Sequence, residues 1–448
     1  MGLKFRLIIM NFLQFFIWGS WLITIGAYWF QTQQWSGAEF GAIFSTMGIA
    51  SLFMPAIAGI IADKWINTEK LLGIFHLGGA IALFALPFAN SPGAMFWIML
   101  INMIFYMPTI ALSISVSYSA LKEDGQDVEK AYPPIRVWGT VGFIIAMWTI
   151  NLGGIAASSA QFFVASGASL VLAIYSFTLP KCPPNKTDEK KSLVDILGLN
   201  AFKLFKDKKM AIFFVFSMLL GAALQLTNAY GDTFLHEFKK IPIFANAFAV
   251  TYSEFIMSIS QISETLFILA IPFFLKRFGI KKVMLMSMFA WVLRFALLGL
   301  GDPMGGLWMI VLSGIVYGMA FDFFNISGSL FVEREANPKF RASAQGLFMM
   351  MTNGFGAIMG SLLSGIMIDK FFVTHEVMST SFIKGFGEKF GNKIVGFITD
   401  PHFTAVTNAF QWRGIWLTFA LYSLIVAFAF MIIFKYKHDP TKITKIKH

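Results

Sequence analysis

The sequence is poor in charge and in cysteine, and both shortages narrow what the chain can be. Only 13% of its 448 residues are Asp, Glu, Lys or Arg, whereas a soluble domain carries about 25%. Cys182 is the single cysteine, so no disulfide can form within the chain. We interpret Cys182 as an ordinary residue of a Lys-rich loop. These shortages exclude a soluble globular domain and a small scaffold held by disulfides.

Signatures of soluble enzymes are missing as well. The chain has no Walker loop, no GxSxG motif and no His/Cys cluster with the spacing of metal ligands. His76 and His236 are isolated in the sequence, and we interpret both as structural or surface residues. The sequence therefore predicts a protein that is not an enzyme and that uses no cofactor and no metal site.

Apolar residues are abundant, since 57% of the chain is hydrophobic and 52 residues are Phe. We find twelve apolar segments long enough to span a bilayer, which takes about 20 residues. They lie at 7–30, 39–61, 71–89, 95–118, 133–153, 160–179, 211–235, 252–275, 283–300, 306–331, 343–368 and 411–434. The sequence therefore predicts an all-α membrane protein with twelve transmembrane helices.

A polar connector divides these segments into two sets of six. Residues 180–209 are rich in Lys and contain two consecutive prolines, Pro183 and Pro184. This composition predicts a cytoplasmic linker between an N-terminal six-helix bundle at 1–179 and a C-terminal six-helix bundle at 210–448. Glycines and basic residues recur weakly at corresponding places in the two halves, which is typical of parallel repeats.

Most of the 35 Lys and Arg residues fall on one side of the predicted membrane. With the N-terminus inside, that side holds both termini, the linker and the connectors after segments two, four, eight and ten. The connectors after segments one, three, five and nine carry no Lys or Arg. Cytoplasmic loops are enriched in these residues, so we predict that both termini are cytoplasmic. The same bias accounts for the net charge of +11, and nucleic acid is not an expected partner.

Glu264 is the only charged residue in the apolar run 255–275. An ionised side chain at the centre of a membrane helix costs about 3 kcal/mol, so such residues face a cavity, a partner or a proton path. Gln261 lies one turn earlier on the same face, and Gln225 and Asn228 repeat this spacing on the preceding segment. The four side chains predict a binding cavity. The alternatives are an ion pair between Glu264 and a buried cation, and amides that only join helices.

Arg136 is another isolated charge in apolar surroundings. Thr140 and Phe143 follow it by four and seven residues, so all three share one helix face. In a cavity, the planar guanidinium could hold a carbonyl of the ligand or pair with Glu264. The alternative is an interfacial arginine that extends to the lipid headgroups.

The tenth segment contains Tyr317 and Phe321, whose spacing of four residues predicts an aromatic shelf. Packing alone is the alternative explanation in a chain so rich in Phe. Asp322 is an isolated membrane carboxylate, and an ion pair with Arg294 in the neighbouring segment would be its ordinary role. Asp232 extends the polar face of the seventh segment by one more turn, close to the expected outer surface.

Four stretches resemble the nucleoside:proton symporters of the major facilitator superfamily. They are Phe15–Trp21, Pro133–Thr140, Ser258–Phe267 and Phe321–Gly328, and the resemblance covers nearly the whole chain. It implies a major facilitator fold in the bacterial inner membrane. It also implies import of purine and pyrimidine nucleosides by alternating access, driven by the proton gradient. The expected partners are a nucleoside of the uridine, adenosine or cytidine type and the lipid bilayer, and we expect a monomer.

The resemblance further implies a nucleoside site between the two halves. It assigns Arg136, Thr140 and Phe143 to one wall. It assigns the other wall to Gln225, Asn228, Gln261, Glu264, Tyr317 and Phe321. Ribose hydroxyls suit amides and carboxylates, and a base stacked on an aromatic side chain contributes about 1–3 kcal/mol. Glu264, Asp322 and Arg136 are the predicted proton-coupling residues.

Two other functions stay open on sequence alone. The first is a proton-coupled symporter for sugars or polyols on the same fold, whose site would favour a Trp platform and more carboxylates. The second is an integral membrane transferase, which would need catalytic polar residues at interfacial depth. The connector at 371–411 is longer than the family resemblance leads us to expect, and its role is left open.

Overall fold

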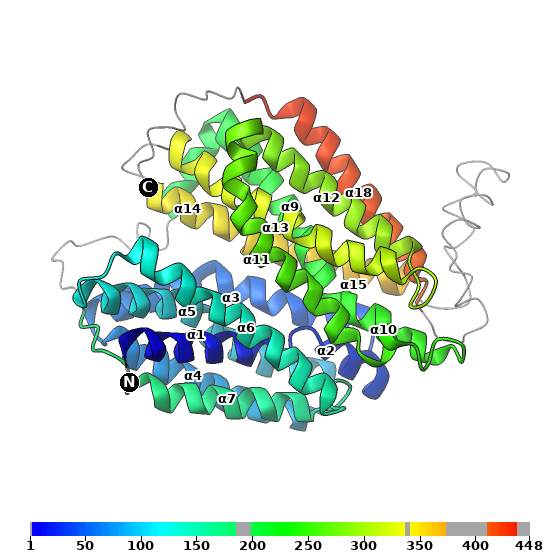
Figure 1. Cartoon of the computed structure of the whole chain (residues 1–448), viewed down its shortest axis with the longest axis horizontal. Helices are drawn as coiled ribbons and strands as arrows, with labels where there is room; N and C mark the ends of the chain where they lie inside the picture. The colour runs from blue at the N-terminus through cyan, green and yellow to red at the C-terminus, as the bar shows by residue number, and fades with distance from the viewer. Residues whose placement is uncertain (1, 185–198, 337–340, 373–409, 437–448) are drawn as a thin grey trace. The chain divides into compact units, whose positions relative to one another are not determined.

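The computed structural model describes residues 2–184, 199–336, 341–372 and 410–436, and these fold almost entirely into helices (Figure 1). Within these ranges, ten helices are apolar and at least 18 residues long, which is sufficient to cross a membrane. Residues 185–198 of the predicted linker at 180–209, and most of the connector at 371–411, lie outside the described residues.

The spanning helices follow the order expected from the apolar segments. They are α3 (Gly37–Lys64), α4 (Thr68–Ala85), α5 (Pro92–Glu123), α6 (Val128–Leu152), α9 (Lys208–Glu237), α11 (Ser253–Phe278), α12 (Ile280–Leu300), α13 (Leu307–Glu335), α15 (Ala357–Phe371), and α18 (Trp412–Ile433). The span that ends with α15 begins in α14 (Arg341–Met349) and passes through a π-helical turn at Met350–Gly356. The shorter apolar helix α7 (Ala160–Ser176) corresponds to the predicted segment at 160–179.

The predicted first segment at 7–30 is not one continuous helix. The structure divides it into α1 (Leu3–Gly19), α2 (Ile25–Ala27) and a π-helical turn at Tyr28–Thr32. The hydroxyl of Ser20 donates a hydrogen bond to the carbonyl oxygen of Phe16 at 2.8 Å, where α1 ends. Ser217 makes the same bond inside the continuous helix α9, so the bond of Ser20 accompanies the end of α1 and does not by itself cause it.

The chain divides into two compact units. Unit 1 comprises Met1–Trp35, Ala42–Lys203 and Asn353–Ile358, and unit 2 comprises the remaining segments, Ser36–Gly41, Leu204–Thr352 and Met359–His448. The predicted bundle boundaries at 1–179 and 210–448 stay a prediction, and each unit is described by itself below.

Glycines set the packing of α1 against α6 in unit 1. A Cβ atom added to Gly19 would lie 2.5 Å from the backbone oxygen of Phe143, and one on Gly142 would collide with the backbone oxygen of Phe12. Only glycine permits so close an approach of two helix backbones. This contact fixes the position of α6, which carries Arg136, relative to α1.

A buried polar cluster connects four helices of unit 1 around His76. The Nε2 atom of His76 donates to Gln14 Oε1 at 2.8 Å, and Gln14 Nε2 donates to Thr109 Oγ1 at 2.8 Å. The Nδ1 atom lies 3.3 Å from Ser169 Oγ, and His76 is 1% exposed. His76 is therefore a structural residue, as the sequence analysis expected.

Cys182 is more than an ordinary loop residue. Its backbone N–H donates to the Glu69 carboxylate at 2.8 Å, and its carbonyl oxygen accepts from the N–H of Thr68 at 3.0 Å. These bonds attach the first residues after α7 to the N-terminus of α4. Burial, with smaller contributions from the nearby Glu69 and Glu123 carboxylates, raises the pKa of the Cys182 thiol to about 11. The thiol is therefore protonated at neutral pH.

Candidate functional site

Arg136, Thr140 and Phe143 lie on α6 in unit 1 and share one face through their spacing of four and seven residues. The guanidinium carbon of Arg136 lies 3.9 Å from the ring centroid of Phe15 on α1, which is cation–π geometry. Arg136 and Thr140 are half-buried, and Phe143 is buried. The head group of Arg136 is thus packed on an aromatic ring of α1 and not extended along the helix surface.

The polar side chains of unit 2 lie in two pairs, each with i, i+3 spacing. Gln225 and Asn228 are on α9, and Gln261 and Glu264 are on α11. Gln225 is buried, and the other three are half-buried. The side-chain oxygens of Gln225 and Gln261 are buried and accept no hydrogen bond from the part of the chain that the structure describes. A buried acceptor left in this state costs about 1–3 kcal/mol, which a hydroxyl-bearing ligand would recover.

A close contact between α11 and α13 brings Glu264 near the aromatic residues. A Cβ atom on Gly318 would lie 2.5 Å from the backbone oxygen of Ser263, so this position of α13 requires glycine. The hydroxyl of Ser263 donates to the carbonyl oxygen of Ile315, and the N–H of Gly318 donates to Ser263 Oγ at 3.3 Å. Because Tyr317 adjoins Gly318 and Glu264 adjoins Ser263, the contact places the carboxylate within electrostatic reach of Tyr317.

The predicted aromatic shelf is present on α13. The rings of Tyr317 and Phe321 are nearly parallel, with centroids 5.9 Å apart and an interplanar angle of 5°. Trp291 on α12 packs edge-on against Tyr317 at 5.9 Å, which holds the tyrosine in place. Tyr317 is buried, whereas Phe321 is half-buried and keeps part of its surface exposed.

Arg294 supports this shelf, a role that the sequence analysis missed. It is 1% exposed on α12, and its Nη1 atom donates to Ser313 O at 2.7 Å and to Ser260 Oγ at 3.3 Å. Its Nε atom donates to Thr227 Oγ1 at 3.4 Å, and its guanidinium carbon lies 4.5 Å from the Tyr317 ring centroid. One side chain on α12 thus contacts α9, α11 and α13.

The ion pair with Arg294, which was the alternative role considered for Asp322, is wrong. Across the described ranges, the contacts of Arg294 are with hydroxyls, a carbonyl oxygen and an aromatic ring, and Asp322 is not among them. Asp322 is 5% exposed, and its Oδ2 atom receives no hydrogen bond from a described residue. Its carboxyl group interacts electrostatically with Glu264 instead. Arg294 lies at the level of Ser313, and Ser287 at the level of Ala320, so Arg294 is more than two turns too late on α12 to be the partner of Asp322.

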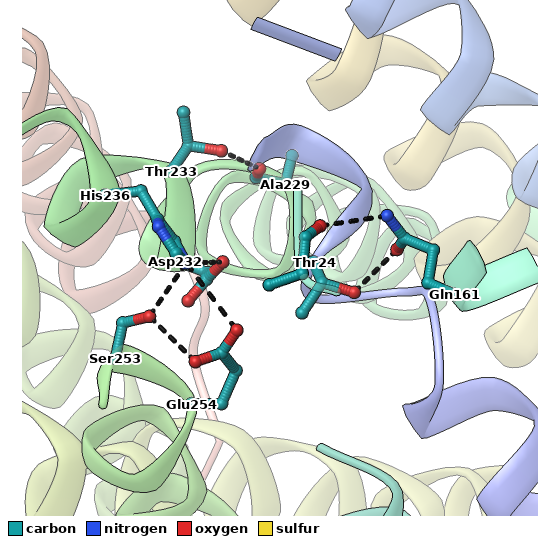
Figure 2. Close-up of polar contacts among 9 residues, drawn as sticks. Thr24, Gln161, Ala229, Asp232, Thr233, His236, Ser253 and Glu254 are labelled. Carbon is teal, nitrogen blue, oxygen red and sulfur yellow. Dashed lines mark hydrogen bonds and ion pairs between the residues drawn. The ribbon is translucent and has the colours of Figure 1, made fainter. Parts of the chain in front are cut away.

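His236 is not isolated, which corrects the interpretation from sequence. It lies on α9 one turn after Asp232, and the first turn of α11 places Ser253 and Glu254 beside it (Figure 2). Asp232 and Glu254 are fully buried, and His236 is 2% exposed. The i, i+4 spacing of Asp232 and His236 was a signal in the sequence. Glu254 belongs to another helix, so only the tertiary structure reveals its contribution.

Comparison with known proteins gives consistent results over the whole chain. The family described as "Nucleoside H+ symporter" matches residues 1–439. The nucleoside permease NupG of Escherichia coli (strain K12) is 50% identical over 451 residues, covering 100% of both chains. The xanthosine permease of the same organism is 50% identical over 444 residues, covering 99% of this chain and 98% of its own. A crystal structure of the nucleoside transporter NupG superposes with a TM-score of 0.84, covering 98% of this chain and 100% of that chain.

Proposed function

This chain belongs to the nucleoside H+ symporter family, and we propose that it imports both purine and pyrimidine nucleosides into a bacterial cell. It is a multi-pass nucleoside:proton symporter and not an enzyme, since its full-length relatives at 50% identity are nucleoside permeases. Because the members of this family are transporters, the alternative of an integral membrane transferase is rejected. Uridine, adenosine and cytidine are the substrates that we propose to test.

The observation that carries the proposed site is the arrangement on α9, α11 and α13 of unit 2. Two buried amide oxygens without a donor and one carboxylate lie on helices that pack against the Tyr317–Phe321 pair. Amide and carboxylate oxygens accept hydrogen bonds from ribose hydroxyls. The half-buried face of Phe321 offers a stacking surface for a base, worth about 1–3 kcal/mol. The combination suits a ligand that has both a ribose and a base.

We propose that both sets of residues bind the same nucleoside. The set of unit 1 is Arg136, Thr140 and Phe143. The set of unit 2 is Gln225, Asn228, Gln261, Glu264, Tyr317 and Phe321. The fork of N–H donors on Arg136 suits the carbonyl edge of a base, since Arg136 is held in a fixed orientation over Phe15.

We assign proton coupling to Glu264 and Asp322, with Arg136 as the cationic member. The two carboxyl groups interact electrostatically, so a proton bound by one changes the charge that the other experiences. Substrate bound at Glu264 would alter the same balance. We further propose an inner-membrane location with both termini in the cytoplasm, which the distribution of Lys and Arg supports, and a monomeric state.

Uptake of radiolabelled uridine into cells or proteoliposomes, with and without a protonophore, tests the function. We expect accumulation against the gradient that the protonophore abolishes. Unlabelled adenosine and cytidine should compete, and free ribose should compete poorly because it lacks the stacking base. Equal competition by ribose and uridine would instead support the alternative of a sugar symporter on the same fold.

The aromatic part of the site can be tested by calorimetry on purified protein. Phe321→Ala and Phe143→Ala should each weaken uridine binding by about 5- to 150-fold, the equivalent of losing one stacking partner. Phe273→Ala is the matched control, because Phe273 is 64% exposed on α11 and contributes to neither set. Wild-type affinity in both site variants would show that these rings serve packing only.

A further inference from the structure

Asp232, His236 and Glu254 converge on one point at the end of α9 (Figure 2). The Nε2 atom of His236 lies 3.4 Å from Asp232 Oδ2 and 3.6 Å from Glu254 Oε1. The three ligand atoms all lie within 4.8 Å of one another. The hydroxyl of Ser253 lies 3.0 Å from the same Nε2 atom and donates to the other oxygen of Glu254, Oε2, at 2.9 Å.

The charge of this cluster is not balanced by the side chains that compose it. Two ionised carboxylates carry two negative charges, and a protonated His236 supplies at most one positive charge. Lys239 interacts electrostatically with Asp232 and His236, but more weakly than the members of the cluster do, and Lys240 is bound to Glu237 at 3.0 Å. Because Asp232 and Glu254 are fully buried, an uncompensated charge there would cost several kcal/mol. One divalent cation together with a neutral imidazole balances the two carboxylates.

The donors and their spacing also fit a metal ion. Zn²⁺ binds His nitrogen and carboxylate oxygen at about 2.0–2.2 Å, so neighbouring ligands of a tetrahedral ion lie roughly 3.4 Å apart. The two nitrogen-to-oxygen distances in the cluster, 3.4 and 3.6 Å, are close to that separation. Independently, Asp232 is fully buried, yet its Oδ1 atom receives no hydrogen bond from a described residue, and its Oδ2 atom lies 3.4 Å from His236 Nε2, longer than an ordinary N–H···O bond. Buried carboxylate oxygens rarely lack a partner.

We propose that Asp232, His236 and Glu254 bind a divalent transition-metal ion of the Zn²⁺ type. The ion takes the Nε2 lone pair of a neutral imidazole and one oxygen from each carboxylate. Ser253 does not bind the ion, but its hydroxyl donates a hydrogen bond to Oε2, the oxygen of Glu254 that faces away from the ion. Such outer contacts orient the metal ligands.

The position of the cluster gives the ion a consequence for transport. Asp232 follows Asn228 by one turn on α9, and Glu254 precedes Gln261 by two turns on α11. A bound ion therefore links the two helices that carry the polar half of the proposed nucleoside site. We expect it to restrict their relative movement and to slow uptake. This consequence rests on the proposed function, whereas metal binding itself does not.

Direct metal binding is the first test. Purified full-length protein, with any affinity tag removed, is dialysed against Zn²⁺ and its metal content measured by mass spectrometry. Affinity is then measured by competition with a chromophoric chelator. We expect about one ion per chain in the wild type. Affinity should fall more than about 100-fold in Asp232→Asn, His236→Gln and Glu254→Gln.

Two controls separate ligand loss from general damage. Glu237→Gln removes an equally buried carboxylate from the same helix, and His76→Gln removes a buried imidazole from unit 1. Both should bind Zn²⁺ like the wild type. His236→Cys should keep binding, and its Co²⁺ complex should gain a thiolate charge-transfer band, since Cys is also a ligand for these ions. This gain of signal does not depend on how well the other variants fold.

The outcomes are distinct. Absence of a stoichiometric ion in the wild type, or equal affinity in the three ligand variants, would overturn the proposal and leave two shared protons as the balancing charge. In the uptake arm, Zn²⁺ should slow wild-type uridine transport and leave His236→Gln unaffected. Failure of uridine uptake with intact Zn²⁺ binding would count against the proposed function alone.

Discussion

Arg294→Lys tests whether the aromatic shelf depends on one buried arginine. The side chain donates hydrogen bonds to Ser313, Ser260 and Thr227 and lies over the Tyr317 ring. Lysine keeps the charge, but a single ammonium cannot reach three helices with the geometry of a planar fork.

The expected cost follows from these contacts. The ammonium can retain the shortest bond, to Ser313 O, which is 2.7 Å long in the native protein. The bonds to the two hydroxyls of Thr227 and Ser260 are lost. Because both are longer than 3.2 Å, the loss of each costs no more than about 1 kcal/mol. Weakening of the buried cation–π contact adds about 1 kcal/mol. The free energy of unfolding should therefore fall by about 2–3 kcal/mol.

The assay is equilibrium unfolding in mixed micelles, followed by tryptophan fluorescence, together with uridine calorimetry. Arg277→Lys is the matched control, because Arg277 is exposed at the end of α11 and should lose less than about 0.5 kcal/mol. Uridine affinity should decrease in Arg294→Lys alone, since Tyr317 loses its support. If the two lysine variants unfold alike and bind uridine alike, the reasoning about Arg294 is refuted.

Three further predictions concern single residues. Glu264→Gln should retain most binding but lose concentrative uptake in proteoliposomes, because a potential of 100 mV drives about a 50-fold accumulation per charge only through a titratable site; normal accumulation would move the proton role to Asp322. Arg136→Lys should fail to restore the uridine affinity lost in Arg136→Ala, and a wild-type value in the lysine variant would support the interfacial alternative. Cys182, whose pKa is raised to about 11, should react with maleimide about 100-fold more slowly at pH 8 than an exposed thiol, and faster only as the pH approaches that value. A rate at pH 8 equal to that of a free thiol would contradict the burial of Cys182.

The sequence by itself determined the class of protein and the faces that carry its polar residues. A bilayer admits only backbones whose hydrogen bonds are satisfied internally, so long apolar segments imply helices without knowledge of packing. Helical periodicity then assigned Gln225 with Asn228, and Gln261 with Glu264, to common faces. Tyr317 and Phe321 were placed in the same way, and their parallel stack confirms the spacing argument. The roles of these residues in binding stay predictions.

Other features were decided by the tertiary structure, because they depend on which helices are neighbours and at what height. The ion pair considered between Arg294 and Asp322 was wrong, because the sequence does not show how α12 and α13 are aligned along their axes. A buried arginine can also be satisfied by hydroxyls, a carbonyl oxygen and an aromatic ring. Apolar periodicity does not report the break after Gly19, and the anchoring of Cys182 depends on bonds to residues far away in the sequence. The cluster at His236 needs a carboxylate from α11, a helix that begins only after α9 has ended and the chain has turned back. Periodicity acts within one helix, whereas ion pairs, buried hydroxyl contacts and metal ligands are shared between helices, and only folding brings those together.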